Sequence, residues 1–507
     1  MTRILGFLHG AILAVSIVLA VPLGVARAES TVSIAVVNDF AGWNPYADST
    51  AQMYMIWCQI YGCLGTFDTT KGEYQPMLAE SWETEKSDPR IWLFHLRHGL
   101  KRQHDGKELT AEDVVHSIER TKNDPRTAQA NNVHPIAKAE AVDKYTVKVT
   151  TTQPTAPLLD FLFDRVIITG KDLYDKYGAD ADRKAPWGWG PYMVENVEIG
   201  QRMVLRKNPD WPGTKAQTPD RLIYMRIKED EARVTALING EVQIALAIPP
   251  HLAERVEAAQ GVKAVGVPSV ENMFLAMNAK MKPWDNVKLR QAVAYAIDRE
   301  AIIKSIFKGR AELLDGPVGP GQYGYSPDVQ PKYRYDPDKA KQLLAEAGYP
   351  NGIDVDFFTA TDRYVNDRQS SEAIAAMLTK VGIRAKLHTP EYSTHWPRVR
   401  KGLVPFYYQG RGAVIDPSPM LEQYFETGVT PRIGYSNPKL DALLDAERRE
   451  FDPAQRKKLL LQAFDIIQEE VPAFFLWRIN AVYGISDKVA FQPHSDERVW
   501  GTDITVK

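Results

Sequence analysis

Residues 75–120 constrain the fold of this chain more than any other stretch of similar length. Within them, the run WLFHLR at 92–97 carries a large apolar residue at every second position, which predicts a half-buried strand. The turn HDG at 104–106 follows, and Thr110 with Asp113 three residues later predicts the capped start of a helix. A strand, a turn and a capped helix occur here without an obvious catalytic constellation. The stretch therefore favours a ligand-binding function over a catalytic one.

The N-terminus has the features of an export signal. A mostly apolar run with its core at 11–23 precedes an A-x-A cleavage pattern at 26–28, so we expect the mature chain to start at Glu29. An uncleaved anchor over residues 4–25 is the alternative, because that run is nearly long enough to span a bilayer. No cysteine precedes Cys58, so lipid modification at the cleavage point is excluded. We expect a soluble protein in the periplasm of a Gram-negative bacterium.

Charge and length limit the class of protein further. Removing residues 1–28 takes away two arginines and no acids, which leaves 60 basic against 64 acidic side chains, a formal charge of −4. This balance indicates neither a nucleic-acid partner nor a membrane-surface partner. The remaining 479 residues (507 minus 28) exceed what one hydrophobic core usually serves, so we expect two or three lobes.

Helices and strands are expected to alternate along the chain, which is typical of α/β lobes with mixed sheets. Asp285 or Asn286, Asp298 and Asp336 are candidate helix caps, each followed by residues at helical spacing. The remaining strong predictions are strands at 31–37, 145–150, 203–206, 222–227 and 383–387, helices at 369–381, 438–450 and 453–470, and a strand-like run after 473.

Cys58 and Cys63 lie close together in an apolar stretch. On one continuous helix their Cα atoms would be about 8 Å apart, too far for a disulfide bond. We therefore favour two buried thiols that act as small apolar side chains. A disulfide is the alternative in an oxidising compartment, and it requires the helix to end near Gly62.

The sequence offers no enzyme motif. It contains no phosphate-binding loop, no HExxH, no nucleophile elbow and no calcium loop. A metal site formed by His95, His98 and His104 is disfavoured, because the first two face opposite sides of the predicted strand. We expect no catalytic residue, no cofactor and no metal. A secreted hydrolase is the alternative from another class, and no residues can be nominated for it.

Several separate motifs, in order, resemble one protein family. The chain is similar to solute-binding family 5, which includes dipeptide, oligopeptide and nickel binding proteins of ATP-driven importers. The resembling segments are 75–120, GWGPYMVENVEIGQRMVLRKNPDW at 188–211, EARVTALINGEVQIA from Glu231, 283–309, 336–349 and GYSNPKLDALL at 434–444.

The resemblance implies a fold and its domains. The expected fold is an α/β two-lobe periplasmic binding protein, class II-like with mixed sheets, with an extra domain inserted in the N-terminal part. The implied N-terminal lobe comprises residues 29–59, 181–272 and 476–507, the inserted domain 60–180, and the C-terminal lobe 273–475.

The resemblance also implies a function. It is that of a periplasmic receptor of an ABC importer, which closes about a hinge over a peptide or a peptide-like carboxylated solute. Opines, nickel complexes and haem are the alternative ligands. The implied partners are the solute, an inner-membrane permease and its cytoplasmic ATPase, with no nucleic acid, and the receptor is expected to be a monomer.

By the same resemblance, residues 406–420 line the ligand cleft. Asp416-Pro417 looks like the family's acid-proline pair, but Ala413 stands where peptide binders carry an aspartate. Arg411 lies nearby, and a guanidinium in a cleft that excludes water selects a carboxylate or a phosphate. We take Tyr408, Arg411 and Asp416 as ligand-binding candidates. A surface or inter-lobe role is the alternative for Arg411.

Four further residues are candidates for ligand contact. Trp187 and Trp189 are followed by glycines that let a backbone approach a solute, and core packing is the alternative. Asn38 and Asp39 follow the first strand, where the resemblance implies contact with the ligand backbone, and a simple turn is the alternative.

Overall fold

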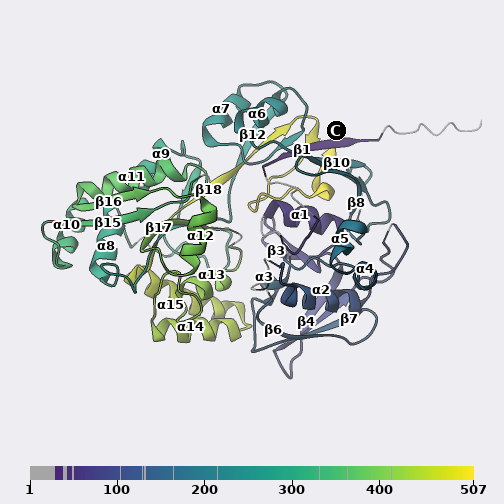
Figure 1. Ribbon diagram of the computed structural model, residues 1–507, viewed down its shortest axis with the longest axis horizontal. Coiled ribbons are helices and arrows are strands. Elements are labelled where there is room, and N and C mark those ends of the chain that lie inside the picture. Colours follow the sequence, from purple (N-terminus) through teal and green to yellow (C-terminus); the bar gives the residue numbers. More distant parts are fainter. Residues whose placement is uncertain are drawn as a thin grey trace, which may run out of the picture.

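The computed structural model describes most of the chain after the predicted export signal. The described residues are 29–37, 43–47, 51–102, 104–127, 130, 133–163, 165–213, 215–329, 332–361, 363–412 and 414–507. The predicted signal at 1–28 and the candidates Asn38 and Asp39 lie outside them. Figure 1 shows two bodies side by side, with strand β18 running between them. Within the described ranges, no helix is both long and apolar enough to span a bilayer.

The N-terminal lobe is built on one part of a twelve-stranded sheet, in the order β18-β11-β1-β10-β9-β8. Its strand β1 (Thr31–Val36) pairs in parallel with β10 and β11. Val32, Ile34 and Val36 lie in the core because alternate residues of β1 face it. The other elements of this lobe are α1 (Ala51–Ile60), β8 (Tyr192–Glu198), β9 (Arg202–Lys207), β10 (Arg221–Arg226), α6 (Asp230–Ile238), β11 (Ile244–Ala245), α7 (Pro250–Glu257), β12 (Val262–Pro268), β19 (Val489–Ala490) and β20 (Thr505–Val506).

The inserted domain contains a hairpin and a four-stranded antiparallel sheet in the order β4-β5-β7-β6. Trp92, Phe94 and Leu96 on β5 (Ile91–Leu96) are buried, which confirms the predicted alternation. The predicted cap of α2 (Ala111–Asn123) is also confirmed, since the Thr110 N–H donates to Asp113 Oδ2 at 3.1 Å. The other elements are β2 (Gly65–Asp68), β3 (Glu73–Pro76), β4 (Ala79–Thr84), β6 (Ile136–Ala141), β7 (Thr146–Thr151), α3 (Leu158–Leu162) and α4 (Lys171–Tyr177), and the short α5 (Ala181–Lys184) follows just beyond residue 180.

The C-terminal lobe surrounds the other part of the large sheet, in the order β16-β15-β17-β13-β18. Asn286, Asp298 and Asp336 cap α8 (Val287–Ala296), α9 (Arg299–Ser305) and α10 (Pro337–Glu346) through their side chains, as the sequence predicted. The remaining elements are β13 (Asn272–Met277), β14 (Ala311–Leu313), β15 (Ile353–Phe358), α11 (Asp367–Lys380), β16 (Ile383–His388), α12 (Tyr392–Arg400), β17 (Phe406–Arg411), α13 (Ser418–Phe425), α14 (Pro438–Arg449) and α15 (Pro453–Glu470).

Strand β18 (Ala473–Ser486) belongs to both lobes. Its first half pairs with β13 and β14, with Trp477 opposite Met273 and Leu313. Its second half pairs with β11 and β12, with Gly484 opposite Ala245. The segment 269–271 between β12 and β13 is a second crossing from one lobe to the other. We call this segment the hinge segment.

The cysteines differ from the favoured expectation. Cys58 and Cys63 form a disulfide bond with a Cα–Cα distance of 5.4 Å, so the interpretation as two thiols is wrong. The reason is local: α1 ends at Ile60, and the chain turns at Gly62, whose φ is +95°. This turn brings the two Cα atoms closer than a continuous helix would allow.

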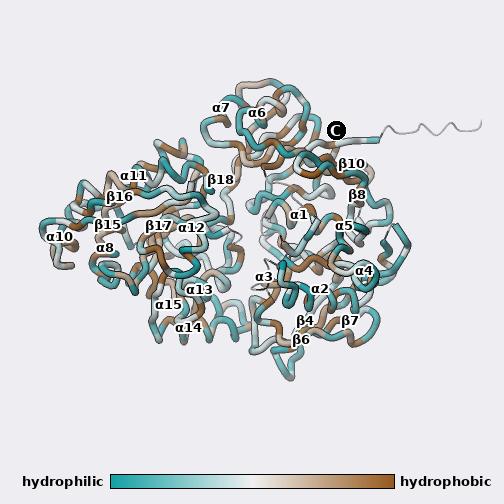
Figure 2. Tube along the Cα trace, viewed as in Figure 1, coloured by the Kyte–Doolittle hydropathy of each residue, from teal (hydrophilic) through white to brown (hydrophobic). Residues whose placement is uncertain are grey.

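The inserted domain and the C-terminal lobe touch each other across the molecule. The Ala156 N–H donates to the Arg448 carbonyl oxygen at 2.7 Å, and His134 Nε2 lies 3.0 Å from Glu422 Oε1. Brown, hydrophobic segments in Figure 2 lie mainly inside each body, as around β17, and teal, hydrophilic ones mainly at outer loops. The two bodies therefore have separate cores and meet through polar contacts and through one aromatic contact, in which the rings of Trp92 and Phe451 lie 6.0 Å apart.

Candidate ligand-binding cleft

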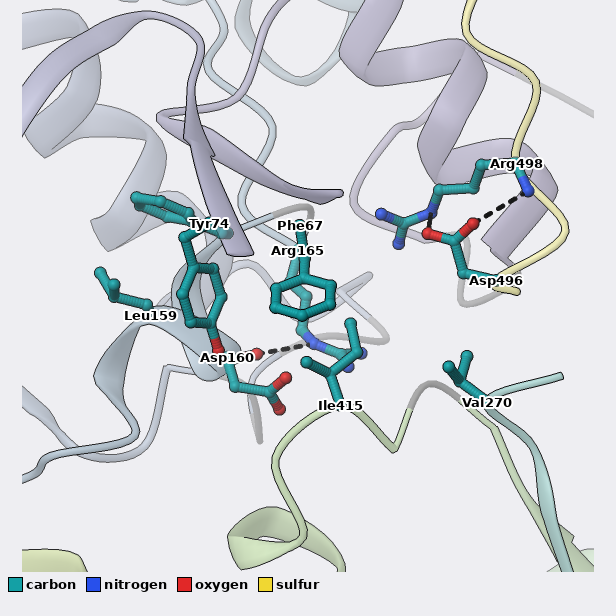
Figure 3. Close-up of a pocket in the computed structure, with 10 residues that line it drawn as sticks. Phe67, Tyr74, Leu159, Asp160, Arg165, Val270, Ile415, Asp496 and Arg498 are labelled. Atoms are coloured by element: carbon teal, nitrogen blue, oxygen red, sulfur yellow. Dashed lines mark hydrogen bonds and ion pairs between the residues drawn. The ribbon is translucent and has the colours of Figure 1, made fainter. Parts of the chain in front are cut away.

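A cavity of about 40 Å³ lies where the inserted domain, both lobes and the hinge segment meet. Its lining consists of Phe67, Tyr74, Leu159, Asp160, Phe163, Arg165, Val270, Ile415, Asp496 and Arg498. Figure 3 shows Asp160 and Tyr74 on one side of this cavity and Asp496 with Arg498 on the other. A cavity of this size holds on the order of a few water molecules. A larger solute therefore requires the bodies to be further apart, or the side chains to be rearranged.

The hinge segment ties the walls of the cavity together. The Val270 N–H donates to the Ser495 carbonyl oxygen, and the Val270 carbonyl oxygen accepts from the Val414 N–H, both at 2.9 Å. The Ser495 N–H in turn donates to Thr69 Oγ1 of the inserted domain at 3.0 Å. One hinge residue thus connects the C-terminal segment of the N-terminal lobe to the loop that follows β17.

Asp160 is the buried carboxyl group at this junction, with only 5% of its surface exposed. It lies on α3, and its carboxylate accepts a hydrogen bond from the backbone N–H of Asp416 in the C-terminal lobe. Burial raises the pKa of Asp160 to about 6, although the guanidinium groups of Arg165 and Arg411 oppose the shift. Arg165 Nε donates to the Asp160 carbonyl oxygen at 2.9 Å.

Arg411 ends β17 and is half-buried beside the cavity lining. Its Nη1 donates to the neighbouring Gly412 carbonyl oxygen at 2.9 Å, and its buried Nε has no hydrogen-bond partner among the described residues. Burial lowers the pKa of the Arg411 guanidinium, and the positive charge of Arg165 lowers it further. Two arginines from opposite bodies therefore approach one another, which is favourable when an anion lies between them.

Two glutamates lie at the hinge side. Glu271 follows Val270, and its Oε1 is 4.0 Å from Arg363 Nη2. Burial raises the pKa of Glu271, while Arg363 and then Arg411 oppose the shift. Burial, followed by the charge of Glu271, raises the pKa of Glu497 to about 7. The two carboxylates are close enough to repel each other when both are ionised.

Asp416 lies at the cleft, but its carboxylate has structural partners. Both of its oxygens accept from Arg456, at 2.6 and 2.8 Å, and Oδ1 also accepts from the Ser418 N–H at 3.0 Å. Arg456 also pairs with the fully buried Glu447 at 2.9 Å. This buried network fixes the start of α13 and leaves the Asp416 carboxylate little capacity for a solute.

The predicted aromatic candidates lie away from the cavity. Tyr408 is fully buried in the core of the C-terminal lobe, 6.1 Å from Tyr364 between ring centres. Trp189 is fully buried against the core of the inserted domain, and its Nε1 donates to the Lys107 carbonyl oxygen at 3.0 Å. Trp187 is half-buried and stacks on His104 at 5.1 Å. In this structure, these three rings contribute to packing within single bodies.

Six charged residues of the cleft were missed from the sequence, namely Asp160, Arg165, Glu271, Asp496, Glu497 and Arg498. Asp160 stands alone among apolar residues in PLLDFLF at 157–163, a pattern that indicates a buried acid. Glu271 and Asp496 have no local sequence signal, because they meet the cleft only through long-range pairing. In the described ranges, no group of three or more His, Cys, Asp or Glu side chains could hold a metal ion.

Comparisons with known proteins agree on one scaffold. The sequence model of the bacterial extracellular solute-binding proteins, family 5, matches residues 73–432. The dipeptide-binding protein of Escherichia coli K12 is 29% identical over 472 residues, covering 86% of each chain. Heme-binding protein A of Haemophilus influenzae is 30% identical over 451 residues, covering 82% of this chain and 80% of the relative.

Solved structures with a similar fold agree with the sequence comparisons. The periplasmic binding protein DppA of Helicobacter pylori in complex with the peptide STSA aligns with a TM-score of 0.80 and 26% identity, over 94% of this chain and 98% of that chain. The protein AgaA of A. tumefacien R10, solved with agropinic acid, aligns with a TM-score of 0.78 and 26% identity, over 94% and 99%. The expected two-lobe periplasmic binding protein fold is confirmed.

Proposed function

The chain belongs to the bacterial extracellular solute-binding proteins of family 5, and from this premise we propose that it is the periplasmic receptor of an ABC importer. It captures a peptide or a peptide-like carboxylated solute and delivers it to an inner-membrane permease driven by a cytoplasmic ATPase. A dipeptide-binding relative and a peptide-bound structural neighbour support this choice of solute.

The observation that carries the proposal is a cavity whose lining comes from both bodies. Asp160 and Arg165 come from the inserted domain, Asp496 from the C-terminal segment, and Ile415 from the loop after β17 beside Arg411. A solute that touches both bodies shifts the balance between open and closed forms, because only differential contact can do so. Bending at the hinge segment and β18 is the movement that such contact drives.

Arg411 is the residue that we assign to the solute's carboxylate. Arg165 faces it from the inserted domain and lowers its pKa, and the Asp160 carboxylate offsets only part of this repulsion, so a further anion is favoured there. Asp416 is assigned to the scaffold, because Arg456 occupies both of its oxygens.

Several features of the wider proposal rest on the sequence. Residues 1–28 direct export and are then removed, and the receptor acts as a monomer. The domain division at 59/60, 180/181, 272/273 and 475/476 belongs to the same proposal. Trp187, Asn38 and Asp39 stay candidates for contact with the solute in an open form of the protein.

A carboxylated opine is the second candidate solute. AgaA, solved with agropinic acid, is a structural neighbour, and two arginines on opposite walls suit a solute with more than one acidic group. Haem is a further alternative, supported by the similarity to heme-binding protein A. A secreted hydrolase would cleave peptides on incubation, which mass spectrometry of the products detects.

The decisive experiment identifies the solute directly. The protein is purified from its own periplasm and studied by native mass spectrometry, and the co-purified ligand is sequenced or fragmented. A peptide supports the proposal, an opine or haem selects an alternative, and cleaved peptides would refute the receptor function. Titration calorimetry with the identified solute then compares the wild type with Arg411→Ala, Arg411→Lys and the control Arg384→Ala. Arg384 is a suitable control because it is exposed on β16 and paired with Asp354.

A further inference from the structure

A second cavity lies inside the C-terminal lobe, away from the cleft. Its volume is about 130 Å³, against about 40 Å³ for the cavity at the cleft, and the two share no lining residue among those described. Its walls are strand β14, the loop at 315–329 and helix α15, which is labelled in Figure 1. A space of this size holds about ten water molecules or one small organic molecule. It is therefore a candidate binding site that lies within a single lobe.

The loop at 315–329 is held in place by two buried side-chain amides. Gln322 Oε1 accepts from the Gly319 N–H at 2.7 Å, and Gln322 Nε2 donates to the Val414 carbonyl oxygen at 2.6 Å. Asn272 Nδ2 donates to the Pro317 carbonyl oxygen at 2.7 Å and to Gln322 Oε1 at 3.1 Å. These bonds fix the loop backbone where it lines the cavity. The cavity is therefore formed before any molecule enters it, as is usual for ligand sites.

One part of the cavity wall is apolar. Phe464 of α15 and Val318 of the loop are buried and line it, and the partly exposed Leu461 and Tyr325 complete this part. Gly324 lets the loop pass close to α15, because its φ is +84° and a Cβ there would lie 3.4 Å from the Phe464 ring. This part of the wall suits a hydrocarbon group, which gains free energy when it leaves water.

The charged part of the wall is acidic. Glu312 Oε2 accepts from Arg478 Nε at 3.0 Å, and Asp315 Oδ1 accepts from Arg299 Nη2 at 3.1 Å. The other oxygen of each carboxylate accepts no hydrogen bond from the described residues, and the two side chains are 34% and 31% exposed. Both arginines are buried and lie outside the lining, which contains no lysine, arginine or histidine among the described residues. The cavity thus offers two carboxylate oxygens as acceptors and no cationic donor.

We propose that this cavity is a second binding site, and that its ligand is a small organic ammonium ion. The ammonium group, which has three donors, binds to the second oxygens of Glu312 and Asp315. The hydrocarbon part of the ligand packs on Phe464 and Val318. A carboxylated molecule is disfavoured, because the lining repels it. Binding needs no closure of the lobes, since the whole lining belongs to one of them, and it is independent of the solute in the cleft.

The test uses three short probes of similar length, namely n-butylammonium, 1-butanol and butyrate. Methyl NMR of the full-length mature protein follows Val318 and Leu461 in this cavity and Val270 in the cleft. We expect n-butylammonium to shift the signals of Val318 and Leu461 with a dissociation constant on the order of 1–10 mM, and to bind at least about tenfold more tightly than the other probes. Equal binding of 1-butanol or butyrate, shifts at Val270 alone, or no shift would overturn the inference.

Two variants test the acidic part of the wall. Glu312→Gln and Asp315→Asn keep the shape and remove one charge each, so each should weaken binding of n-butylammonium about tenfold and leave that of 1-butanol unchanged. The matched control is Asp328→Asn, which is exposed on the same loop and does not line the cavity. If both variants fold, as judged by their melting curves, and bind n-butylammonium like the wild type, the carboxylates serve only their arginines and the inference is wrong.

A third variant blocks the cavity and leaves both carboxylates in place. Leu461→Trp puts a larger side chain into the space, so n-butylammonium should no longer shift the Val318 signal. Leu443→Trp is the matched control, because Leu443 is also partly buried against the core of this lobe but lies on α14, outside the lining. Wild-type binding by folded Leu461→Trp would place the probe elsewhere and overturn the inference. Should the charge variants fail to fold, this variant and the comparison of the three probes decide.

Discussion

Replacing Asp160 by asparagine should remove a pH dependence of closure. Asp160 is buried because α3 of the inserted domain meets the loop before α13, where the Asp416 N–H donates to the Asp160 carboxylate. When the two bodies separate, this carboxylate meets water and regains its usual pKa of 3.8. The closed form therefore binds a proton more tightly than the open form does.

The size and the sign follow from the two pKa values. Between 3.8 and about 6, the closed form is protonated while the open form is ionised, so closure becomes easier as the pH falls. From pH 7.5 to pH 5 the ratio of closed to open molecules should rise about tenfold, or about 1.4 kcal/mol. Above about pH 6 the burial of ionised Asp160 opposes closure with its full free-energy cost, and this cost is lost as the pH falls through that value.

Fluorescence energy transfer measures the effect. Dyes placed on Val142 of the inserted domain and Leu403 of the C-terminal lobe, both more than half exposed, report the separation of the two bodies. The wild type should close on acidification, and Asp160→Asn should lose the tenfold part of this response that Asp160 contributes, while Glu497, whose pKa is about 7, keeps a response of its own. Asp338→Asn, whose carboxylate is 91% exposed on α10, is the control and should behave like the wild type. An unchanged pH response in Asp160→Asn would refute the reasoning.

Three other changes have defined outcomes. Arg411→Ala should weaken binding of a carboxylated solute by at least about 2 kcal/mol, roughly 30-fold, measured by calorimetry. Cys63→Ser should lower the free energy of unfolding by about 2 kcal/mol, because the disulfide closes a short loop, and denaturant titration measures this. Arg456→Ala should lower it by about 3–5 kcal/mol, because it leaves Asp416 and Glu447 buried without a counter-charge, and circular dichroism follows the melting.

Each of these changes has a control. Arg411→Lys keeps the charge but loses the planar fork, so it should recover only part of the affinity. Reduced wild type should unfold like Cys63→Ser, and a larger loss in the variant would mean that packing, not the bond, is responsible. Arg449→Ala removes a neighbouring arginine that is half exposed and should cost under about 1 kcal/mol. A comparable loss in Arg449→Ala and Arg456→Ala would contradict the role given to the buried network.

Local elements were predictable because their signals are local. The caps Asn286, Asp298 and Asp336 each precede a helix with its own apolar face, and the structure contains all three. The helices predicted at 438–450 and 453–470 appear as Pro438–Arg449 and Pro453–Glu470. Capping and periodicity operate within a few residues, so one segment suffices to reveal them.

The cleft was less predictable because its parts are distant in sequence. Arg411 was identified as a candidate because the family resemblance implies that its loop lines the cleft. The structure places it near Arg165, which lies 246 positions earlier in the chain. Asp496 comes to the cavity only because Val270 bonds to Ser495. The disulfide was predicted wrongly because the exact end of α1 decides whether the two cysteines can meet. The helix ends at Ile60, between Cys58 and Cys63, and this allows the bond.

The shared strand β18 has a consequence for the order in which the molecule can be assembled. It completes the sheets of both lobes, yet it lies at residues 473–486 near the end of the chain. A chain that emerges from its N-terminus cannot close either lobe until this strand has emerged, although β1 and β10 are ready much earlier. Pairings over such long sequence separations form slowly, so both lobes close late. The architecture thus delays closure of both lobes until the C-terminal strand is available, which suits the export that we propose for this chain.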